Sequence, residues 1–582
     1  MYIFKKSATE FYVAENCVEE YKAFTSEEVL KSFAWIEEQK NLGRSIFSYF
    51  TYEASKAFDS RHAVHESADA LAYFVSVDDL KVLSRFELLD NDKQAPVALK
   101  IEPEIDEARY TEDLKSVHKF IYEGDVYQIN YSFRNQLPIA ETALELFKRL
   151  EREHPVPYSC YIDCGDQSVV SLSPELFLAS EGQSILTEPM KGTCSRAHTL
   201  ADDKTVQEDL HKDIKTRAEN VMIVDLMRND IGRICEVGSV KVEDLFEVAA
   251  YPSLHQMTSK VKGKLKAGTS LQDIFKATYP PGSITGAPKI RAMEVIKELE
   301  SSARGVYTGV AGLIQPDSFV FNVCIRTLMV KDQVATLGLG SGVVADSAYD
   351  LEWDECLLKG KFLNFRYDFD ELFETILWKR ESSFIYLEEH LARLRKSAKY
   401  FAISINEEEL KELFRTWENE LLKSEGDIYR CRLALSKMGE VSYSSVELKH
   451  ESWGKEEVSV KISSQSVNSQ SLYQYHKTNH RQTYNDEFVL ASKEGFDEVL
   501  FFNEKGHLAE GAISNVFVRL AGRWFTPQVS DGLLPGVWRE KMIKELRAEE
   551  RSLTQKDLEE ADDILIGNSV RMGAKSKLKT SL

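Results

Sequence analysis

The sequence lacks three features: a long apolar run, paired cysteines and a block of basic residues. No run approaches the roughly 20 apolar residues that cross a bilayer, and the first residues show no charged-then-apolar signal segment. The eight cysteines are scattered without a CxxC pair, which is typical of reduced thiols rather than of disulfides or zinc sites. We therefore expect a cytoplasmic protein with no membrane partner.

The charge balance also disfavours nucleic acid as a partner. The chain carries 94 acidic and 73 basic residues, a net charge of -21, and this charge repels phosphate backbones. No Lys/Arg cluster has the size that a nucleic-acid site needs. An anionic substrate would therefore need a locally cationic site.

The length of 582 residues is too great for one core, while 43% hydrophobic and 29% charged residues are typical of globular proteins. The pattern changes character near residue 366 without a linker rich in Pro, Gly or Ser. We expect two domains, residues 1–365 and 366–582. Short strand-like runs in residues 1–100, with a helical segment at 26–40, predict an antiparallel sheet with helices.

A lysine on a turn is the first candidate for chemistry. Lys191 lies in LTEPMKGTCSR between Pro189 and Gly192, residue types that are typical of turns. From this stretch alone, a solvated loop lysine is the more common case. The segments SLSPELFL before it, and AENVMIVDLMRNDIGR and PPGSITGAPKIRAM after it, favour a functional role.

Carboxylates on two predicted helices form a candidate metal site. The pattern predicts a helix over 205–229, on which Glu219 lies beside apolar Val221 and Met222, so we expect its carboxylate to be only partly solvated. Glu352 and Glu355 are spaced i, i+3 and share one helix face. Glutamates from two helices suit Mg²⁺, which prefers hard oxygen ligands. Either element alone is more often a solvated acidic face.

Two glycine-rich segments do not match nucleotide-binding motifs. PPGSITGAPKIRAM predicts a turn that leads into an amphipathic helix, with Pro288 near its first turn, but lacks the P-loop spacing. GLGSGVVAD, residues 338–346, has GxGxG instead of GxGxxG. Small residues there favour close approach of a ligand to the backbone.

Taken together, these segments resemble the chorismate-utilising enzymes, and within them component I of aminodeoxychorismate synthase. The resemblance covers about residues 45–362 and rests on seven motifs in order, among them YEGDVYQINYSFR, SLSPELFL, EPMKGT and FNVCIRTL. Anthranilate synthases look like PIAGT where this chain has EPMKGT. The resemblance implies an α+β protein whose first domain is a chorismate-binding two-sheet α/β sandwich.

The same resemblance implies covalent catalysis by Lys191. The family's lysine amine adds at C2 of chorismate as hydroxide leaves C4, and ammonia then enters at C4 and expels the lysine, which replaces one hard displacement by two easier ones. Such an amine must be neutral, so its pKa should be lowered. Glu175 matches the family's general acid/base, and His255 matches a histidine near the ring.

The resemblance also assigns binding residues. Glu219 and Glu355 match Mg²⁺ ligands, with Glu352 in support, although Thr216 stands where relatives carry an acidic residue. The positions that match contacts to the substrate's carboxylates are Thr285, Tyr307, Arg326, Gly340 and Gly342. No cysteine lies in a GxCxG setting, so we expect ammonia from a separate glutamine amidotransferase subunit, or free ammonia.

Residues 368–582 resemble the class IV, or fold-type IV, aminotransferases, including aminodeoxychorismate lyase, through HLARL, HKTNHR and EGAISNVF in order. This resemblance implies pyridoxal 5'-phosphate. Lys477 would bind the cofactor and act as the base, and Glu510 would hydrogen-bond the pyridine nitrogen. The expected phosphate contacts are Arg393, Gly536, Val537, Asn568 and Ser569.

The two resemblances together predict synthesis of 4-aminobenzoate for folate. The first domain would aminate chorismate to 4-amino-4-deoxychorismate, and the second would eliminate pyruvate. Three alternatives stay open: an anthranilate synthase-like first domain, an amino-acid transaminase as the second domain, and a scaffold without activity. A homodimer formed through the second domain is also open.

Overall fold

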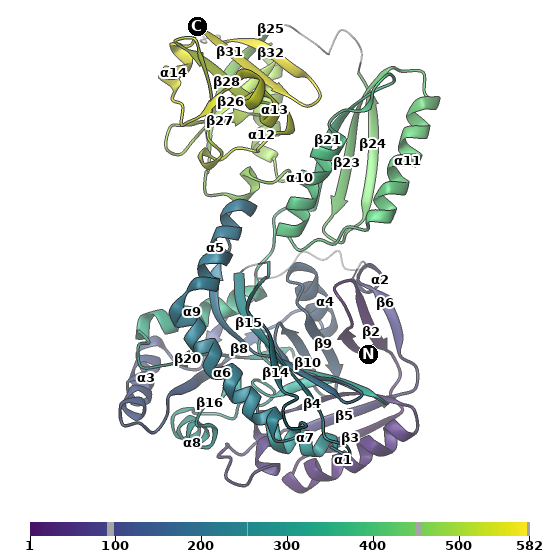
Figure 1. The fold of residues 1–582 in the computed structure, drawn as a ribbon, viewed down its shortest axis with the longest axis vertical. Coiled ribbons are helices and arrows are strands. Elements are labelled where there is room, and N and C mark those ends of the chain that lie inside the picture. The colour runs from purple at the N-terminus through teal and green to yellow at the C-terminus, as the bar shows by residue number, and fades with distance from the viewer. Residues whose placement is uncertain (90–97, 253, 449–456, 579–582) are drawn as a thin grey trace. The chain divides into compact units, whose positions relative to one another are not determined.

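The computed structural model describes residues 1–89, 98–252, 254–448 and 457–578. The chain divides into two compact units (Figure 1). The first comprises Met1–Arg196 and Val206–Arg366, and the second comprises Ala197–Thr205 and Tyr367–Leu582. Within the described ranges, no helix is both long and apolar enough to cross a membrane.

Two large, mainly antiparallel sheets form the first unit. In the described residues the first sheet has the order β16 (Gly286–Ala287), β8 (Gln128–Pro138), β20 (Val334–Val343), β19 (Thr327–Lys331), β10 (Ser168–Ser173), β9 (Tyr158–Asp163), β1 (Tyr2–Lys5), β2 (Glu10–Ala14) and β6 (Lys81–Ser84), with β7 (Glu102–Pro103) beside β8. The second has the order β13 (Met190–Ser195), β15 (Leu254–Lys264), β12 (Ser184–Glu188), β11 (Leu176–Glu181), β18 (Ser318–Val323), β17 (Val310–Gln315), β4 (Ser45–Phe50), β5 (Ala72–Val77) and β3 (Glu19–Ala23), with β14 (Lys241–Ala250) beside β15.

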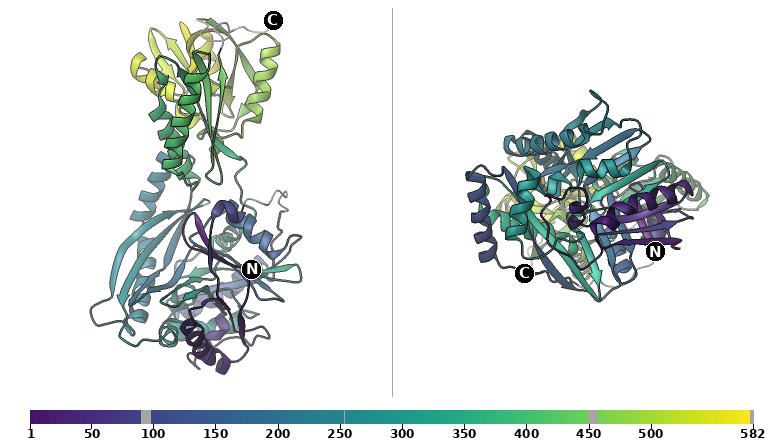
Figure 2. Two further views of the ribbon diagram at one scale, coloured as in Figure 1. Left: turned by 90° about the vertical axis from the view of Figure 1, so that its right-hand side faces the viewer. Right: turned by 90° about the horizontal axis from the view of Figure 1, so that it is seen from below.

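Apolar side chains from both sheets pack together in one core cluster. Phe4 and Ile162 come from the first sheet, Phe47 and Leu313 come from the second, and all four are almost fully buried. Each strand turns alternate residues toward this layer. The opposite face of the second sheet is covered by α1 (Ser26–Asn41), α6 (Ile214–Gly232) and α7 (Leu271–Thr278), which share a second core cluster with it (Figures 1 and 2). The predicted α+β fold is confirmed.

The helices of residues 1–366, in chain order, are α1 (Ser26–Asn41), α2 (Arg85–Leu89), α3 (Glu107–Tyr122), α4 (Ala143–Glu153), α5 (Leu200–Lys212), α6 (Ile214–Gly232), α7 (Leu271–Thr278), α8 (Lys289–Leu299) and α9 (Tyr349–Gly360). The first residues of α5, up to Thr205, belong to the second unit. The predicted helix at 26–40 is confirmed as α1. Its capping box explains the start, because Thr25 and Glu28 each bond the other's backbone N–H.

The predicted single helix over 205–229 is wrong in its continuity. The chain forms α5 and α6, which are separated at Asp213. The Asp213 carboxylate accepts a hydrogen bond from the backbone N–H of Thr216 at 2.7 Å and so caps a new helix. An aspartate that bonds the backbone in this way competes with helix continuation.

The described residues of the second unit form two sheets. In the described residues the smaller has the order β22 (Ser383–Phe384), β21 (Glu371–Lys379), β23 (Ile428–Ser436) and β24 (Val441–Glu447). The larger has the order β27 (Leu508–Gly511), β26 (Glu498–Asn503), β25 (Glu457–Val467), β32 (Met572–Leu578), β31 (Asp563–Asn568), β28 (Asn515–Leu520), β29 (Arg523–Thr526) and β30 (Glu549–Glu550). Its helices are α10 (Leu387–Tyr400), α11 (Glu407–Lys423), α12 (Gln482–Lys493), α13 (Val537–Leu546) and α14 (Gln555–Glu559).

Strand pairing fixes the positions of the candidate residues in both units. In the first, β13 pairs with β15 and places Lys191 opposite Met257, while β20 pairs with β8 and places Gly342 opposite Asn130. In the second, the backbone N–H of Phe373 on β21 donates to the carbonyl of Lys477 at 2.9 Å. Backbone pairing therefore holds both lysines, although Lys477 lies outside regular structure.

Candidate active sites

A cavity of about 910 Å³ in the first unit gathers the dispersed sequence motifs. It lies among residues of both sheets, α6 and α9. The predicted site residues that line it are Glu175, Lys191, Glu219, Tyr307, Arg326, Gly340, Gly342, Glu352 and Glu355. Segments more than 150 residues apart in sequence thus face one space of a size typical for small-molecule sites.

Lys191 projects its amine into this cavity from β13. Its Nζ donates a hydrogen bond to the carbonyl of Ser283 at 3.2 Å. Burial lowers the pKa of Lys191, the positive charge of Lys359 lowers it further, and Glu175 opposes the shift. A larger fraction of this amine is therefore neutral than of an ordinary lysine.

Glu175 is the candidate acid that shares a hydrogen-bonded neighbour, Ser283, with Lys191. It is 3% exposed, and its Oε1 accepts a hydrogen bond from the Ser283 hydroxyl at 2.6 Å. Burial raises the pKa of Glu175 to about 7, against the lowering effects of Ser283 and Lys191. This carboxyl group can therefore give or take a proton near neutral pH. Ser283 contacts both groups, through its carbonyl and its hydroxyl.

Arg326 brings positive charge to the cavity. Burial lowers the pKa of its guanidinium to about 10, so it stays charged at neutral pH. Within the described residues, its Nη1 atom is buried without a hydrogen-bond partner. A buried cationic donor without a partner is costly, and an anionic group such as a carboxylate would satisfy it.

Glycines on β20 leave room for the cavity and its lining. A Cβ on Gly338 would lie 2.1 Å from the Tyr307 ring, so any other residue at this position would force Tyr307 to move. A Cβ on Gly342 would lie 2.6 Å from Nε2 of Gln128 and 3.3 Å from Nζ of Lys191. The backbone itself therefore forms the wall beside the amine.

Three glutamates line the cavity from α6 and α9. Burial raises the pKa of Glu219, and the negative charges of Glu355 and Glu352 raise it as well, although Lys191 lowers it. Glu355 forms an ion pair with Lys359 at 2.7 Å. The part of the chain that the structure describes contains no cluster of three or more His, Cys, Asp or Glu side chains arranged to hold a metal ion. The donors still fit Mg²⁺ chemically, because neighbouring carboxylates repel one another until a cation joins them.

Two predicted residues lie beside the cavity without lining it. His255 is fully buried, whereas its neighbours on β15, Leu254 and Gln256, line the cavity. Alternation along β15 turns the His255 ring the other way, where Nδ1 lies 3.3 Å from Nε2 of Gln207. Thr285 is also buried, and its hydroxyl donates to the carbonyl of Pro281 at 2.8 Å. The roles assigned to both residues stay predictions.

Sequence reasoning missed three residues that touch the candidate groups. Ser283 lies in the PPGSITGAP motif, which was the available signal. Lys359 follows Glu355 at i+4, and its Nζ also donates to the carbonyl of Gly340 at 2.9 Å. Gln128 lies in the YEGDVYQINYSFR motif, which was its signal, and the pairing of β8 with β20 brings its amide beside Gly342.

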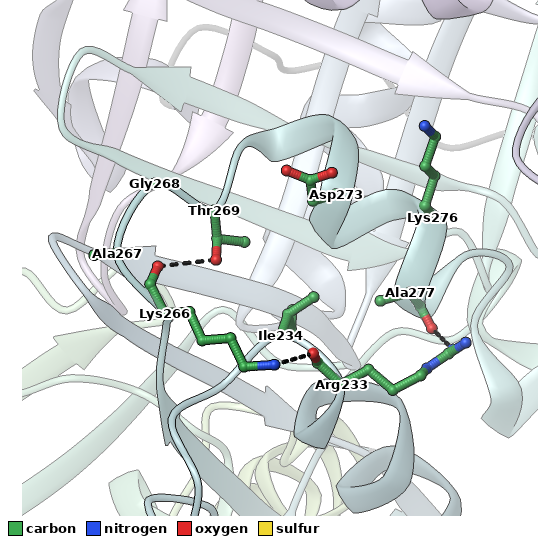
Figure 3. Close-up of a pocket in the computed structure, with 9 residues that line it drawn as sticks. All are labelled: Arg233, Ile234, Lys266, Ala267, Gly268, Thr269, Asp273, Lys276 and Ala277. Carbon is green, nitrogen blue, oxygen red and sulfur yellow. Dashed lines mark hydrogen bonds between the residues drawn. The ribbon is translucent and has the colours of Figure 1, made fainter.

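A second, open depression of about 470 Å³ lies elsewhere on the first unit (Figure 3). Arg233, Lys266 and Lys276 contribute positive charge to it. Two of these cations are engaged by the backbone, since Lys266 Nζ donates to the Arg233 carbonyl at 2.7 Å and Arg233 donates to the Ala277 carbonyl. It contains none of the predicted site residues, so it is not a candidate active site.

In the second unit, Lys477 has the properties of a reactive amine. Its Nζ lies 4.7 Å from the centroid of the Phe373 ring. Burial lowers the pKa of Lys477 to about 7, and the charges of Arg481 and Arg393 contribute. Near neutral pH, a large fraction of this amine is neutral.

Glu510 provides a carboxylate acceptor on β27. One oxygen, Oε2, accepts a hydrogen bond from the backbone N–H of Leu534 at 3.2 Å. The other, Oε1, is buried without a hydrogen-bond partner in the described residues. Burial raises the pKa of Glu510 to about 7, although Arg481 lowers it. An orphaned acceptor of this kind fits the protonated ring nitrogen of pyridoxal phosphate.

A basic group and a helix N-terminus lie together in the same unit. Arg393 on α10 donates from Nη1 to the carbonyl of Pro535 at 3.3 Å, and Gly536 caps the start of α13. A Cβ on Gly536 would lie 2.0 Å from Oδ1 of Asn515, so glycine is needed there. The arrangement fits a phosphate group. Ser569, which follows β31, is buried.

Two family models match the chain. Residues 1–364 match the chorismate binding enzyme family, and residues 371–575 match amino-transferase class IV. The first match covers more than half of the 582 residues, and the chain therefore belongs to the chorismate binding enzymes, with an amino-transferase class IV domain fused behind. Both predicted resemblances are confirmed at this level.

Curated relatives carry two different names. Anthranilate synthase component 1 1 from Haloarcula marismortui is 42% identical over 270 residues, which are 45% of this chain and 55% of that protein. Aminodeoxychorismate synthase component 1 from Bacillus subtilis is 37% identical over 258 residues, 43% of this chain and 55% of that protein. The chain thus spans about half the length of the curated relatives it matches.

A solved structure is similar to the first unit. Anthranilate synthase component I from Streptococcus pneumoniae TIGR4 has a TM-score of 0.54 at 25% identity, and the match covers 61% of this chain and 92% of that chain. The similarity agrees with the family match. It does not distinguish an anthranilate synthase from an aminodeoxychorismate synthase, so that distinction has to come from the residues of the cavity.

The first prediction concerns Gly192. Its φ is +79°, and a Cβ there would lie 2.0 Å from Cγ2 of Thr216. We expect Gly192→Ala to displace Lys191 and to reduce chorismate consumption about tenfold or more, because strain and a clash act together. Gly182→Ala is the matched control, since its φ is +56° and nothing lies within 4 Å of its Cβ.

A double variant separates the clash from the backbone strain. Gly192→Ala combined with Thr216→Ser removes the clashing methyl group and should restore part of the consumption of chorismate, measured by its absorbance. Equal rates for Gly192→Ala and Gly182→Ala would contradict the prediction.

The second prediction concerns pH. Because only the neutral amine of Lys477 can capture pyridoxal phosphate, the capture rate should be constant above pH 7 and fall below it. The fall should approach about tenfold per pH unit. Stopped-flow absorbance with cofactor-free protein measures this rate. If the capture rate instead begins to fall as the pH drops below 10.5, the ordinary pKa of lysine, burial does not lower the pKa of this amine.

Proposed function

We propose that the chain makes 4-aminobenzoate from chorismate in two steps. The first unit replaces the C4 hydroxyl of chorismate by an amino group and forms 4-amino-4-deoxychorismate. The second unit, with pyridoxal phosphate, eliminates pyruvate from that product and leaves the aromatic ring. A separate glutamine amidotransferase supplies the ammonia. The reaction belongs to folate biosynthesis.

One observation carries the proposal for the first unit: an amine of lowered pKa lies in a cavity with a proton-carrying glutamate and with a guanidinium whose Nη1 has no hydrogen-bond partner in the described residues. Lys191 supplies the amine, and Ser283 joins it to Glu175 through two hydrogen bonds of 3.2 and 2.6 Å. Arg326 provides an unsatisfied donor for a carboxylate of the substrate. A lysine nucleophile would have no role in an anthranilate synthase, which the resemblance associates with PIAGT at this position.

The residues of the first unit support a defined sequence of steps. Neutral Lys191 adds at C2 while Glu175, which holds a proton near pH 7, gives it to the hydroxide that leaves C4 as water. Ammonia then adds at C4, and the bond from C2 to Lys191 breaks. Glu219, Glu352 and Glu355 would hold Mg²⁺, whose charge would balance a ring carboxylate.

In the second unit, Lys477 and Glu510 divide the proton chemistry. Pyridoxal phosphate, when bound to the amino group of the substrate, withdraws electrons from C4. Glu510 would hold a proton at the ring nitrogen through Oε1, which has no hydrogen-bond partner in the described residues. Lys477, with a pKa of about 7, takes the proton from C4, and loss of the enolpyruvyl group as pyruvate completes the aromatic ring.

An anthranilate synthase activity is the second candidate for the first unit. It is favoured by the 42% identical relative of that name. The two reactions differ in their products, because anthranilate carries its amine ortho to the carboxylate and 4-aminobenzoate carries it para. Product identity therefore decides between them.

The third prediction tests both lysines in one reaction. The purified chain with chorismate, ammonium, Mg²⁺ and pyridoxal phosphate should give 4-aminobenzoate and pyruvate, identified by chromatography and mass spectrometry. Lys191→Ala should lower the yield of 4-amino-4-deoxychorismate about a thousandfold or more, because the nucleophile is lost. Lys477→Ala should let 4-amino-4-deoxychorismate accumulate without pyruvate.

Matched controls are exposed lysines on nearby elements. Lys331→Ala on β19 and Lys493→Ala on α12 should keep full yield. Anthranilate as the product would refute the assignment of the first unit. Undiminished 4-aminobenzoate from Lys191→Ala would refute the covalent role of that residue.

The fourth prediction concerns the nitrogen donor. With glutamine in place of ammonium, the purified chain should consume chorismate far more slowly, because none of its cysteines lies in a GxCxG setting. Addition of a glutamine amidotransferase subunit should restore the rate. If glutamine supports the chain alone at the rate seen with ammonium, the inferred partner is not needed.

A further inference from the structure

A buried cluster in the second unit joins Arg393 to two residues that have no role in the chemistry described above. It consists of Glu374 on β21 and of His390 and Arg393 on α10. The side chains of Glu374 and His390 are each 1% exposed, and that of Arg393 is 14% exposed. Three hydrogen bonds of 2.6 to 2.8 Å join them.

Glu374 is a charged group at every working pH. Burial alone would raise its pKa, but the Arg393 guanidinium and the hydrogen bond from His390 outweigh burial and lower the pKa to about 2. Burial lowers the pKa of His390, so its ring is neutral. Nδ1 of His390 therefore carries the hydrogen and donates to Oε2 of the ionised carboxylate at 2.6 Å.

The contacts of Glu374 fix the orientation of the arginine fork. Nε of Arg393 donates to Oε1 at 2.8 Å, and Nη2 donates to Oε2 at 2.6 Å, which is a bidentate pair. The fixed fork then directs Nη1 toward the Pro535 carbonyl, 3.3 Å away, in the loop that leads to Gly536 at the start of α13. The edge of Arg393 that remains for a ligand thus faces the helix N-terminus.

We propose that Glu374, supported by His390, is a positioning residue that orients Arg393 toward the phosphate of the cofactor. This inference rests on the proposed assignment of pyridoxal phosphate to the second unit. The described hydrogen bonds of the Glu374 carboxylate go to His390 and Arg393, so it acts on the phosphate through Arg393. His390 completes the coordination of Oε2 and restricts the rotation of the carboxylate.

A purely structural role makes a different prediction. If Glu374 only held α10 against β21, its loss would weaken binding of any ligand in the site. If it acts on the phosphate through Arg393, its loss weakens binding of pyridoxal phosphate and spares pyridoxal, which lacks the phosphate group. Comparison of the two ligands therefore separates the two roles.

The fifth prediction uses Glu374→Gln in the full chain. Titration of cofactor-free protein, followed by absorbance, should give an affinity for pyridoxal phosphate about tenfold or more below that of the native chain, because a charge-assisted pair is lost. The affinity for pyridoxal should change less than about twofold. Adding Arg393→Ala to Glu374→Gln should cause no greater loss than Arg393→Ala alone, because the two residues act as one unit.

Glu371→Gln is the matched control. Glu371 lies on the same strand and forms an ion pair with Arg432, but it does not contact α10 residues His390 or Arg393 in any described interaction. This variant should bind both ligands as the native chain does. Should Glu374→Gln fail to fold, His390→Leu provides the same comparison, because it removes only the hydrogen bond to Oε2; it should lower the affinity for pyridoxal phosphate several-fold and spare pyridoxal.

The outcomes distinguish the inference from the proposed function. A native chain that fails to bind pyridoxal phosphate more tightly than pyridoxal would refute the cofactor assignment itself. Tight binding by the native chain with equal losses for both ligands in Glu374→Gln, or with no loss at all, would overturn the positioning role and leave the cofactor assignment intact.

Discussion

Burial of a lysine amine is the constraint on which both candidate sites depend. A protonated amine loses its hydration when it is buried, so burial favours the neutral form, which can attack an electrophile. Lys191 donates to a neutral carbonyl at 3.2 Å, and Lys359 adds positive charge nearby. Lys477 lies against the Phe373 ring, with Arg481 and Arg393 as its charged neighbours. In both units, the surroundings oppose the ammonium form more strongly than the nearby carboxylates favour it.

Each amine shares its surroundings with a glutamate of raised pKa, and the same burial accounts for both shifts. Glu175 and Glu510 each have a pKa of about 7, and Lys477 has a similar value. Desolvation raises the pKa of a carboxylic acid and lowers the pKa of an amine, so burial of both groups brings their pKa values closer together. Proton exchange between an acid and a base is easiest when their pKa values are close. The two unrelated folds thus meet the same physical requirement with different scaffolds.

Much of the candidate chemistry was predictable from motifs, because chemical residue types recur at fixed places in them. Lys191, Glu175, Arg326 and the glutamate pair of α9 all line one cavity. The prediction of one continuous helix was wrong because the local pattern did not contain the deciding contact. The helix over 205–229 breaks because the Asp213 carboxylate bonds the N–H of Thr216. His255 turns away from the cavity because of its place in the alternation along β15, which a motif alone does not fix.

The sequence by itself determined the two families, because these depend on motifs and on their order, and it predicted the candidate reactive residues from the same motifs. Only the tertiary structure decided which groups meet. Ser283 bridges Lys191 and Glu175, Gln128 lies beside Gly342, and Glu374 orients Arg393 across β21 and α10. These contacts join residues distant in sequence or on different elements. Their distances and burial, and hence the pKa values, exist only after the sheets and helices have packed.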